Sequence, residues 1–268
     1  MTAAAPRSQA VIQIGGIAVC VRADDSAFLA MLKHRYRGFV GGSAPADFHF
    51  ETDLASAGNG DPNADLRLTR RAGSWTLERG DFRAEWDAVS SSGKIQLLPN
   101  PYSIDTLLRI LHSLTLARQG GFLLHAASAI RNGKAFLFTG VSGAGKTTIA
   151  RLAPKDATLL TDEISYVRKD QNAYIACGTP FSGELGRPGE NVWAPLAAVY
   201  LLAKGPENRI DSLSAAEATH AVLSNLLFFA EDRELVNSVF YSVCEFVGRV
   251  PVSRLTFFPD SQVWEMLQ

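Results

Sequence analysis

Residues 134–148 hold the pattern with the clearest chemical meaning in this chain. An apolar run, Ala135–Phe138, leads into Gly140, then four further residues, then Gly145-Lys146-Thr147. This is the P-loop pattern, in which the backbone N–H groups of a glycine-rich turn converge on phosphate oxygens. The lysine reaches the β- and γ-phosphates, and the hydroxyl of the next residue holds Mg²⁺. The pattern predicts binding of a nucleoside triphosphate with Mg²⁺.

We expect the nucleotide to contact this turn and the first residues of the helix that follows it. The expected contacts are Gly140, Ser142, Gly143, Ala144, Gly145, Lys146, Thr147 and Thr148. A glycine-rich turn with an incidental lysine is the alternative. The strand-like run before the turn and the helix-compatible run 147–153 after it argue against that alternative.

Two adjacent carboxylates, Asp162 and Glu163, follow the apolar run Leu159–Thr161. Phosphoryl transfer needs carboxylates near the metal ion, and one of them can take the proton of an acceptor hydroxyl. Adjacent strand residues point opposite ways, so the two need not share a role. We expect this strand to lie beside the strand before the P-loop, which would bring the pair to the phosphates. The alternative is a solvated loop end or a helix cap.

Two further candidates are weaker. His125 lies on an apolar strand, where a histidine is more often a core residue than a catalytic one. The loop from Gly178 to Glu190 is rich in Gly and Pro, and its Glu184 and Arg187 could meet the acceptor or the transferred phosphoryl group, since arginine suits phosphate geometry. A plain surface loop is the alternative.

The elements that would position these residues fall into two regions. Residues 1–102 begin with two short strands around Gly15-Gly16, then a helix capped by Asp24 or Asp25. Alternating apolar and polar residues over 46–98 then predict an antiparallel sheet, so this region is a smaller α+β region with one helix. It could bind the acceptor or another partner.

The second region, 103–268, alternates strands and helices and holds the P-loop, which predicts an α/β domain. We expect it to begin with an amphipathic helix, Ser103–Arg118, capped by Ser103. A turn at Asn132-Gly133 leads into the P-loop strand, and Ser214 with Glu217 forms a capping box. Ser261 is expected to cap a terminal turn.

Composition excludes several classes of function. The net charge is -1, which gives no overall electrostatic footprint for nucleic acid or an acidic membrane. No apolar run is long enough to span a bilayer, and the N-terminus has no hydrophobic core typical of a secretory signal. The three cysteines lie far apart without metal-ligand spacing, which fits buried thiols in a reducing cytoplasm.

In this order, His125, the P-loop, Asp162-Glu163 and the Gly-Thr-Pro-Phe-Ser-Gly-Glu loop resemble the catalytic domain of the bacterial HPr kinase/phosphorylase family, whose fold is shared with phosphoenolpyruvate carboxykinases. The resemblance covers Leu123 to about Leu202. It implies that Lys146 contacts the phosphates, that Thr147 and Glu163 belong to the metal site, and that Asp162 is the base that activates a serine hydroxyl. His125 is implied to be a neighbour of that base, and the family assembles as an oligomer.

Two departures from the family narrow what the resemblance implies. This chain has Asp-Glu where the family usually has Asp-Asp, and it lacks the Arg-Gly-Leu-Gly stretch associated with phosphorylase activity. The sequence therefore predicts an ATP- and Mg²⁺-dependent kinase that phosphorylates a hydroxyl, with a serine of a protein or peptide as the acceptor. Two alternatives stay open: a nucleotide-binding regulatory module without transfer activity, and a small-molecule kinase or carboxykinase-like enzyme.

Overall fold

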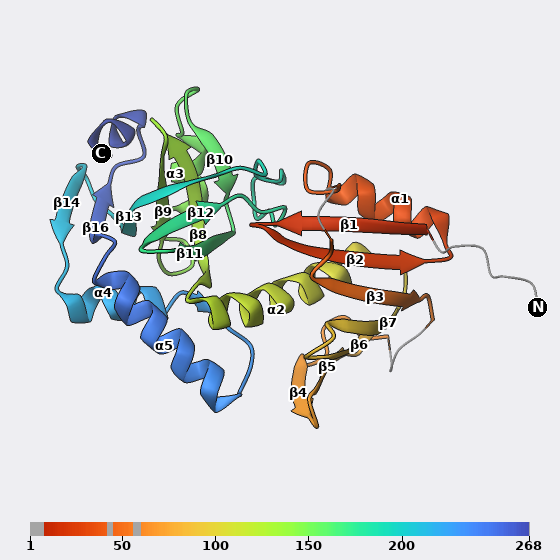
Figure 1. Ribbon diagram of the computed structural model, residues 1–268. Helices are drawn as coiled ribbons and strands as arrows, with labels where there is room; N and C mark the ends of the chain where they lie inside the picture. Colours follow the sequence, from red (N-terminus) through yellow and green to blue (C-terminus); the bar gives the residue numbers. More distant parts are fainter. Residues whose placement is uncertain (1–7, 42–44, 56–59, 268) are drawn as a thin grey trace, which may run out of the picture. The chain divides into compact units, whose positions relative to one another are not determined.

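The computed structural model describes residues 8–41, 45–55 and 60–267 (Figure 1). The chain forms two compact units, and the division falls inside the long helix α2 (Pro101–Gln119). Unit 1 holds the residues up to His112 together with Phe229–Asp232. Unit 2 holds Ser113–Phe228 and Arg233–Gln268, and therefore all of the sequence-predicted site residues.

Unit 1 is built on a seven-stranded sheet in the described part of the chain. The strands lie in the order β1-β2-β3-β7-β6-β5-β4. Their bounds are β1 Ser8–Ile14, β2 Ile17–Ala23, β3 Phe48–Asp53, β4 Arg67–Arg71, β5 Ser74–Arg79, β6 Phe82–Asp87 and β7 Ser92–Leu97. Helix α1 (Ser26–Arg35) begins after Asp25, one of the two predicted caps, whose side chain accepts the N–H of Phe28.

The prediction of an antiparallel sheet is wrong for two strand pairs. β3 runs parallel to β2 on one side and parallel to β7 on the other. Parallel neighbours need a long crossover, and the chain provides two. One is the segment 24–47 that contains α1, and the other is the excursion through β4, β5 and β6. Unit 1 is therefore mixed α/β, with one sheet of parallel and antiparallel pairs.

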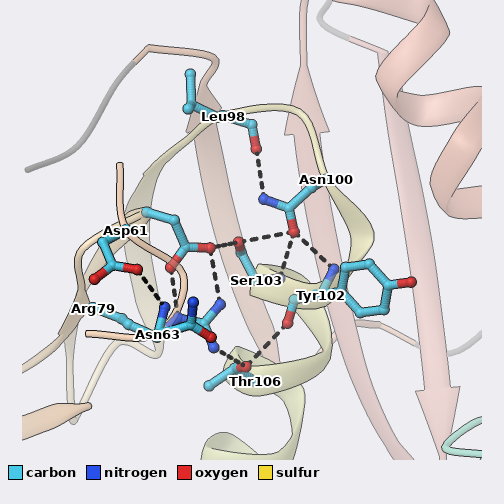
Figure 2. A network of polar contacts seen from close by, with 9 residues as sticks. Asp61, Asn63, Arg79, Leu98, Asn100, Tyr102, Ser103 and Thr106 are labelled. Atoms are coloured by element: carbon cyan, nitrogen blue, oxygen red, sulfur yellow. Dashed lines mark hydrogen bonds and ion pairs between the residues drawn. The ribbon is translucent and has the colours of Figure 1, made fainter. Parts of the chain in front are cut away.

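Helix α2 begins two residues earlier than the sequence predicts, because Asn100 and not Ser103 caps it. The Asn100 side chain accepts the N–H of Ser103 at 3.0 Å, and Pro101 occupies the first helical position (Figure 2). The Ser103 hydroxyl donates to the buried carboxylate of Asp81 at 2.7 Å. Arg79 donates to the same carboxylate. Burial raises the pKa of Asp81, but the hydrogen bonds from Arg79 and Ser103 and the charge of Arg79 together lower it below its usual value. This network anchors the start of α2 within unit 1.

Unit 2 contains the second sheet, with nine strands among the described residues. The main order is β10-β8-β11-β12-β13-β16-β14, while β9 pairs with β8 and β13, and β15 pairs with β8. The strands are β8 Phe122–Arg131, β9 Lys134–Thr139, β10 Thr158–Thr161, β11 Ile164–Asp170, β12 Ala173–Cys177, β13 Trp193–Lys204, β14 Arg209–Ser212, β15 Leu226–Leu227 and β16 Val252–Phe257. The helices are α3 Lys146–Arg151, α4 Ala215–Leu223, α5 Arg233–Val247 and the 3-10 helix Ser261–Met266.

The two faces of this sheet bury different helices. On one face, strand residues such as Phe122 and Leu137 pack with Val222 of α4 and Phe246 of α5. Figure 1 shows α4 and α5 next to each other. On the other face, Phe138 packs with Ile149 of α3 and with the residues of the C-terminal 3-10 helix. Unit 2 is a layered α/β unit, and α3 lies on the face opposite α4 and α5.

Several local predictions for unit 2 are confirmed and others are wrong. Asn132 and Gly133 form the turn between β8 and β9 with positive φ angles, and the capping box of Ser214 and Glu217 is present. The terminal 3-10 helix is capped by Asp260 and not by Ser261. The short strands β14 and β15 were not predicted, because stretches this short carry little periodicity. None of the described helices has the length and apolarity needed to cross a membrane.

Candidate functional site

The glycine-rich turn leaves the end of β9 and enters α3 at Gly145. Gly145 has φ +111° and caps α3 without a side chain. A Cβ at this position would lie 2.7 Å from the ring of Phe257, so both the backbone angle and the space require glycine. Val141, Ser142 and Gly143 at the tip of the turn are exposed. The turn therefore presents backbone to solvent between a buried strand and a buried helix start.

Lys146, the first residue of α3, folds back over the turn. Its ammonium group donates to the carbonyl oxygens of Gly140 at 2.9 Å and Val141 at 3.3 Å. The residue is only 8% exposed. Burial lowers the pKa of Lys146, and the charge of Glu163 acts in the opposite direction. The side chain is thus held at the mouth of the turn, with a carboxylate close enough to affect its proton affinity.

The centre of β8 brings the turn and the carboxylates together. On one side, Ala126 is paired with Thr139, the last residue before Gly140. On the other side, the Ala126 N–H donates to the Glu163 carbonyl at 3.1 Å. The prediction that the strand before Asp162 lies beside the P-loop strand is therefore wrong, because β8 lies between β9 and β10. Two strand spacings, about 10 Å, separate β9 from β10.

His125 lies on the sheet face that carries α3. His125 shares this face of β8 with Ala127 and Ala129, which pack with α3, because every second residue of a strand points the same way. Burial lowers the pKa of His125, the positive charge of Lys146 lowers it further, and Glu163 acts in the opposite direction. His125, Lys146 and Glu163 therefore form one electrostatic group although they come from a strand, a helix and the turn between β10 and β11.

Asp162 is bound to the loop between β12 and β13 and is 2% exposed. One carboxylate oxygen accepts the N–H of Gly183 at 2.9 Å, and the other accepts the N–H of Leu185 at 2.8 Å. A Cβ built on Gly183 would also collide with the carboxylate of Glu163. The loop 178–192 therefore lies directly against both carboxylates, a relationship that spacing along the sequence does not reveal.

Two threonines that the sequence reasoning missed shape this turn. The Thr161 hydroxyl donates to the Phe181 carbonyl at 3.0 Å and accepts the N–H groups of Glu163 and Ile164. The Thr179 hydroxyl donates to the Ile164 carbonyl at 3.0 Å. Both threonines are fully buried. A polar residue just before an acidic pair at a strand end was the signal for Thr161, since such hydroxyls satisfy turn N–H groups.

The remaining predicted residues fall into two groups. Ala144 packs into the core under α3, while Thr147 and Thr148 in the first turn of α3 are half-buried. Glu184 and Arg187 are both exposed. Arg187 lines a separate cavity with the end of α3. Glu184 follows Gly183 in the chain and so lies near Asp162 and Glu163. Arg187 lies instead at the cavity beside the end of α3.

The side-chain oxygens described near the glycine-rich turn are few, which fits a Mg²⁺ ion that a bound nucleotide would hold in the main. Among the described residues, no group of three or more His, Cys, Asp and Glu side chains could hold a metal by itself. Mg²⁺ in phosphoryl-transfer sites typically takes one or two protein oxygens and completes its shell with phosphates and water. The Thr147 hydroxyl and the Glu163 carboxylate are the oxygens that would take this role.

Comparison with known proteins gives one family and distant similarity to solved structures. No curated protein matches the chain. Among solved structures, the HPr(Ser) kinase/phosphatase from Coxiella burnetii matches with 13% sequence identity and a TM-score of 0.27, over 45% of this chain and 87% of that chain. The two structures are similar only distantly. The family model for SynChlorMet cassette protein ScmC matches residues 101–268, which is more than half of the sequence. The chain therefore belongs to the ScmC family.

Proposed function

We propose that this protein is a cytoplasmic, ATP- and Mg²⁺-dependent phosphotransferase of the HPr-kinase-like class, with a serine hydroxyl of a protein or peptide as its acceptor. Unit 2 would carry the transfer site, and unit 1 would bind the acceptor or a partner. One observation carries the proposal. Lys146 at the mouth of the glycine-rich turn shares an electrostatic group with Glu163 and His125, and the carboxylate of Asp162 lies next to Glu163 in the chain.

The turn and Lys146 would bind the triphosphate. The Lys146 ammonium group donates hydrogen bonds to two carbonyl oxygens of the turn. A triphosphate would offer oxygens with formal negative charge instead, so the attraction of two opposite charges would replace hydrogen bonds to neutral carbonyls. Because Lys146 is buried, little water shields this attraction. Binding is therefore expected to draw the ammonium group from the carbonyls of Gly140 and Val141 to the phosphates.

Transfer needs an acceptor oxygen in line with the γ-phosphorus and a group that takes its proton. The hydroxyl oxygen forms the new P–O bond, the bond from the γ-phosphorus to the β–γ bridging oxygen breaks, and ADP leaves. The proton of the hydroxyl would go to Asp162. Asp162 is buried under the loop 178–192, which donates the N–H groups of Gly183 and Leu185 to it, so this loop must move before an acceptor hydroxyl can reach the carboxylate. Acceptor binding would be coupled to movement of this loop.

Thr147 and Glu163 would hold Mg²⁺, which neutralises charge on the phosphates when it is bound. His125 would stay neutral at physiological pH, because burial and the Lys146 charge both lower its pKa. A neutral imidazole can accept or donate one hydrogen bond without adding charge to the site. We assign it the role of positioning Glu163.

Radiolabelled ATP tests the proposal directly. The wild-type protein, Lys146→Ala, Asp162→Asn and Glu163→Gln would be incubated with Mg²⁺, γ-labelled ATP and host lysate depleted of small molecules. A labelled polypeptide that disappears in all three variants supports a protein kinase. A labelled metabolite instead of a polypeptide would point to a small-molecule kinase. Unchanged labelling in Lys146→Ala would refute the site.

The hydrogen bonds of Asp162 also favour a second candidate, a nucleotide-binding regulatory module. In such a module, the buried carboxylate of Asp162 would hold the loop through the two N–H groups and would take no proton. Nucleotide binding without transfer, accompanied by a change in hydrogen exchange over residues 178–192, would support this second function. Asp162-dependent labelling of an acceptor would exclude it.

A further inference from the structure

A cavity in unit 2 lies at the C-terminal end of α3, at the opposite end of this helix from the glycine-rich turn. Its volume is about 300 Å³. The lining is contributed by the end of α3, the segment after it, and the loop before β13: Ala150, Arg151, Ala153, Pro154, Lys155 and Ala157 with Leu159, Arg187, Pro188 and Glu190. The walls are small apolar residues and prolines, and the charged groups are three cations and one carboxylate.

The three cations are free to bind something else. Within the described part of the chain, no ion pair or hydrogen bond uses the side chains of Arg151, Lys155 or Arg187, and all three are exposed. The neighbouring carboxylate of Asp156 does not serve them, because it pairs with Arg131 at 3.2 Å. Three unpaired positive charges around one cavity, against the single carboxylate of Glu190, attract a ligand with several negative charges.

The loop that carries Arg187 is held firmly beside β10. The Glu190 N–H donates to the Leu159 carbonyl at 3.0 Å, and the Gly189 N–H donates to the Thr179 carbonyl at 3.0 Å. A Cβ on Gly189 would overlap the carbonyl group of Leu160, so only glycine allows this close approach. The backbone just after Arg187 is therefore held at one edge of the cavity, while the part of the loop near Gly183 and Leu185 can move.

This loop also links the cavity to the acidic pair. Leu185 donates its N–H to Asp162, and Arg187 follows only two residues later. Two residues span at most about 7 Å. A chain that contacts the cavity therefore has the carboxylate of Asp162 within reach of residues a short way along its sequence.

We propose that the cavity docks an acidic segment of the acceptor polypeptide, so that Arg151, Lys155 and Arg187 select acceptors with Asp or Glu side chains a few residues from the phosphorylated hydroxyl. This inference rests on the proposed phosphotransferase function. It names the substrate class of the transfer site: acidic peptides. The carboxylate of Glu190 would repel acidic side chains of the peptide and so weaken their binding to the three cations.

The chemistry favours separate carboxylates over one compact phosphate group. Phosphate sites usually provide backbone N–H groups or a helix N-terminus, whereas this cavity borders the C-terminal end of α3, where Arg151 is the last residue. That end of a helix carries partial negative charge and disfavours a dianion at close range. Exposed Arg and Lys side chains can instead reach outward to individual carboxylates along a peptide.

The test uses the full chain and a fluorescein-labelled peptide that contains one serine within a run of glutamates. A twin peptide has glutamines in place of the glutamates. Fluorescence anisotropy should show the acidic peptide binding about tenfold or more tightly than its twin, since exposed ion pairs each contribute modestly. Added salt should remove most of this difference. Equal affinity for the two peptides would overturn the inference.

Variants locate the binding to the cavity. Removing Arg151, Lys155 or Arg187 by substitution with Ala should weaken acidic-peptide binding about two- to fivefold each. Glu190→Gln should strengthen it, an effect of opposite sign that loss of structure would not produce. Exposed lysines outside the cavity provide matched controls, so Lys134→Ala and Lys204→Ala should leave binding unchanged. Equal losses in the control variants would contradict the site.

Two further measurements separate this inference from the proposed function. Binding of a fluorescent ATP analogue should be the same in the cavity variants as in the wild type, which shows that the variants are folded. Charge-dependent peptide binding without any phosphoryl transfer would sustain the cavity and reject the kinase. Phosphoryl transfer without charge-dependent peptide binding would support the kinase and reject the cavity as a docking site. Tight binding of pyrophosphate that depends on Arg151, Lys155 and Arg187 would show that the cavity binds a phosphate ligand and not an acidic peptide, and would overturn the proposal.

Discussion

The carboxylate of Asp162 accepts the backbone N–H of Gly183 at 2.9 Å, and this hydrogen bond ties the acidic pair to a loop that begins sixteen residues later in the chain, at Gly178. With the second bond to Leu185, both oxygens of Asp162 are used. The position of the loop and the availability of the candidate base are therefore linked. A change at Asp162 is expected to alter loop order as well as turnover.

Asp162→Asn should release the loop. An amide side chain has one acceptor oxygen and an NH₂ group, so one of the two N–H groups of Gly183 and Leu185 would face another donor. A buried N–H left without an acceptor costs about 1–3 kcal/mol. Hydrogen exchange over residues 178–192 should therefore become faster, and any phosphoryl transfer should fall by about two to four orders of magnitude.

Glu163→Gln is the matched control for that experiment. It removes a neighbouring charge but leaves the N–H partners of Asp162 in place. Exchange of the loop should stay near the wild-type rate, while metal-dependent nucleotide binding weakens. Faster exchange in both variants to the same extent would mean that the loop responds to lost charge and not to the two hydrogen bonds.

Lys146→Ala should weaken nucleotide binding by about ten- to a hundredfold, the equivalent of one or two lost charge-assisted hydrogen bonds. It also removes the two bonds from the ammonium group to the turn, so the turn should become less ordered. Calorimetry with a non-hydrolysable ATP analogue measures the effect. Lys134→Ala, at the exposed start of β9, the strand that leads into the turn, should bind normally. Wild-type affinity in Lys146→Ala would remove Lys146 from the site.

Gly145→Ala tests whether the turn depends on its backbone shape. The new Cβ would be strained at φ +111° and would press on the ring of Phe257, 2.7 Å away. Gly133→Ala is the control, because Gly133 also has a positive φ but has no atom within 4 Å of a new Cβ. Each positive-φ substitution costs about 1–3 kcal/mol. The thermal midpoint should fall further for Gly145→Ala, and only this variant should lose nucleotide binding.

His112 should make the protein less stable in acid. Complete burial lowers the pKa of His112 to about 3, whereas an unfolded histidine has a pKa near 6.5. Between these two values the unfolded chain binds a proton that the folded chain does not. The stabilising effect is therefore complete above pH 6.5 and is lost as the pH falls toward 3. The slope is up to about 1.4 kcal/mol per pH unit.

The slope can be isolated with two substitutions. In urea denaturation at pH 7 and pH 5, His112→Gln should lose less stability on acidification than the wild type, whatever its stability at pH 7. His220→Gln, at an exposed position of α4, should keep the wild-type pH dependence. Identical slopes for His112→Gln and the wild type would show that another group causes the acid sensitivity.

Local features of this protein follow from its sequence alone. The turn at Asn132-Gly133, the capping box at Ser214 and Glu217 and the cap at Asp25 depend on residues within a few positions of one another. The strand, glycine-rich turn and helix around Lys146 are local in the same sense. Short-range hydrogen bonds and backbone preferences decide these features, so their residue types predict them.

Contacts between distant segments were decided only by the tertiary structure. Parallel pairing of β3, insertion of β8 between β9 and β10, and the capture of Asp162 by Gly183 and Leu185 all join residues that are remote in sequence. Arg187 likewise lies at a cavity with Arg151 because Gly189 fits against Leu160. Such pairings depend on how whole faces are buried together, and periodicity identifies a face without naming its neighbour.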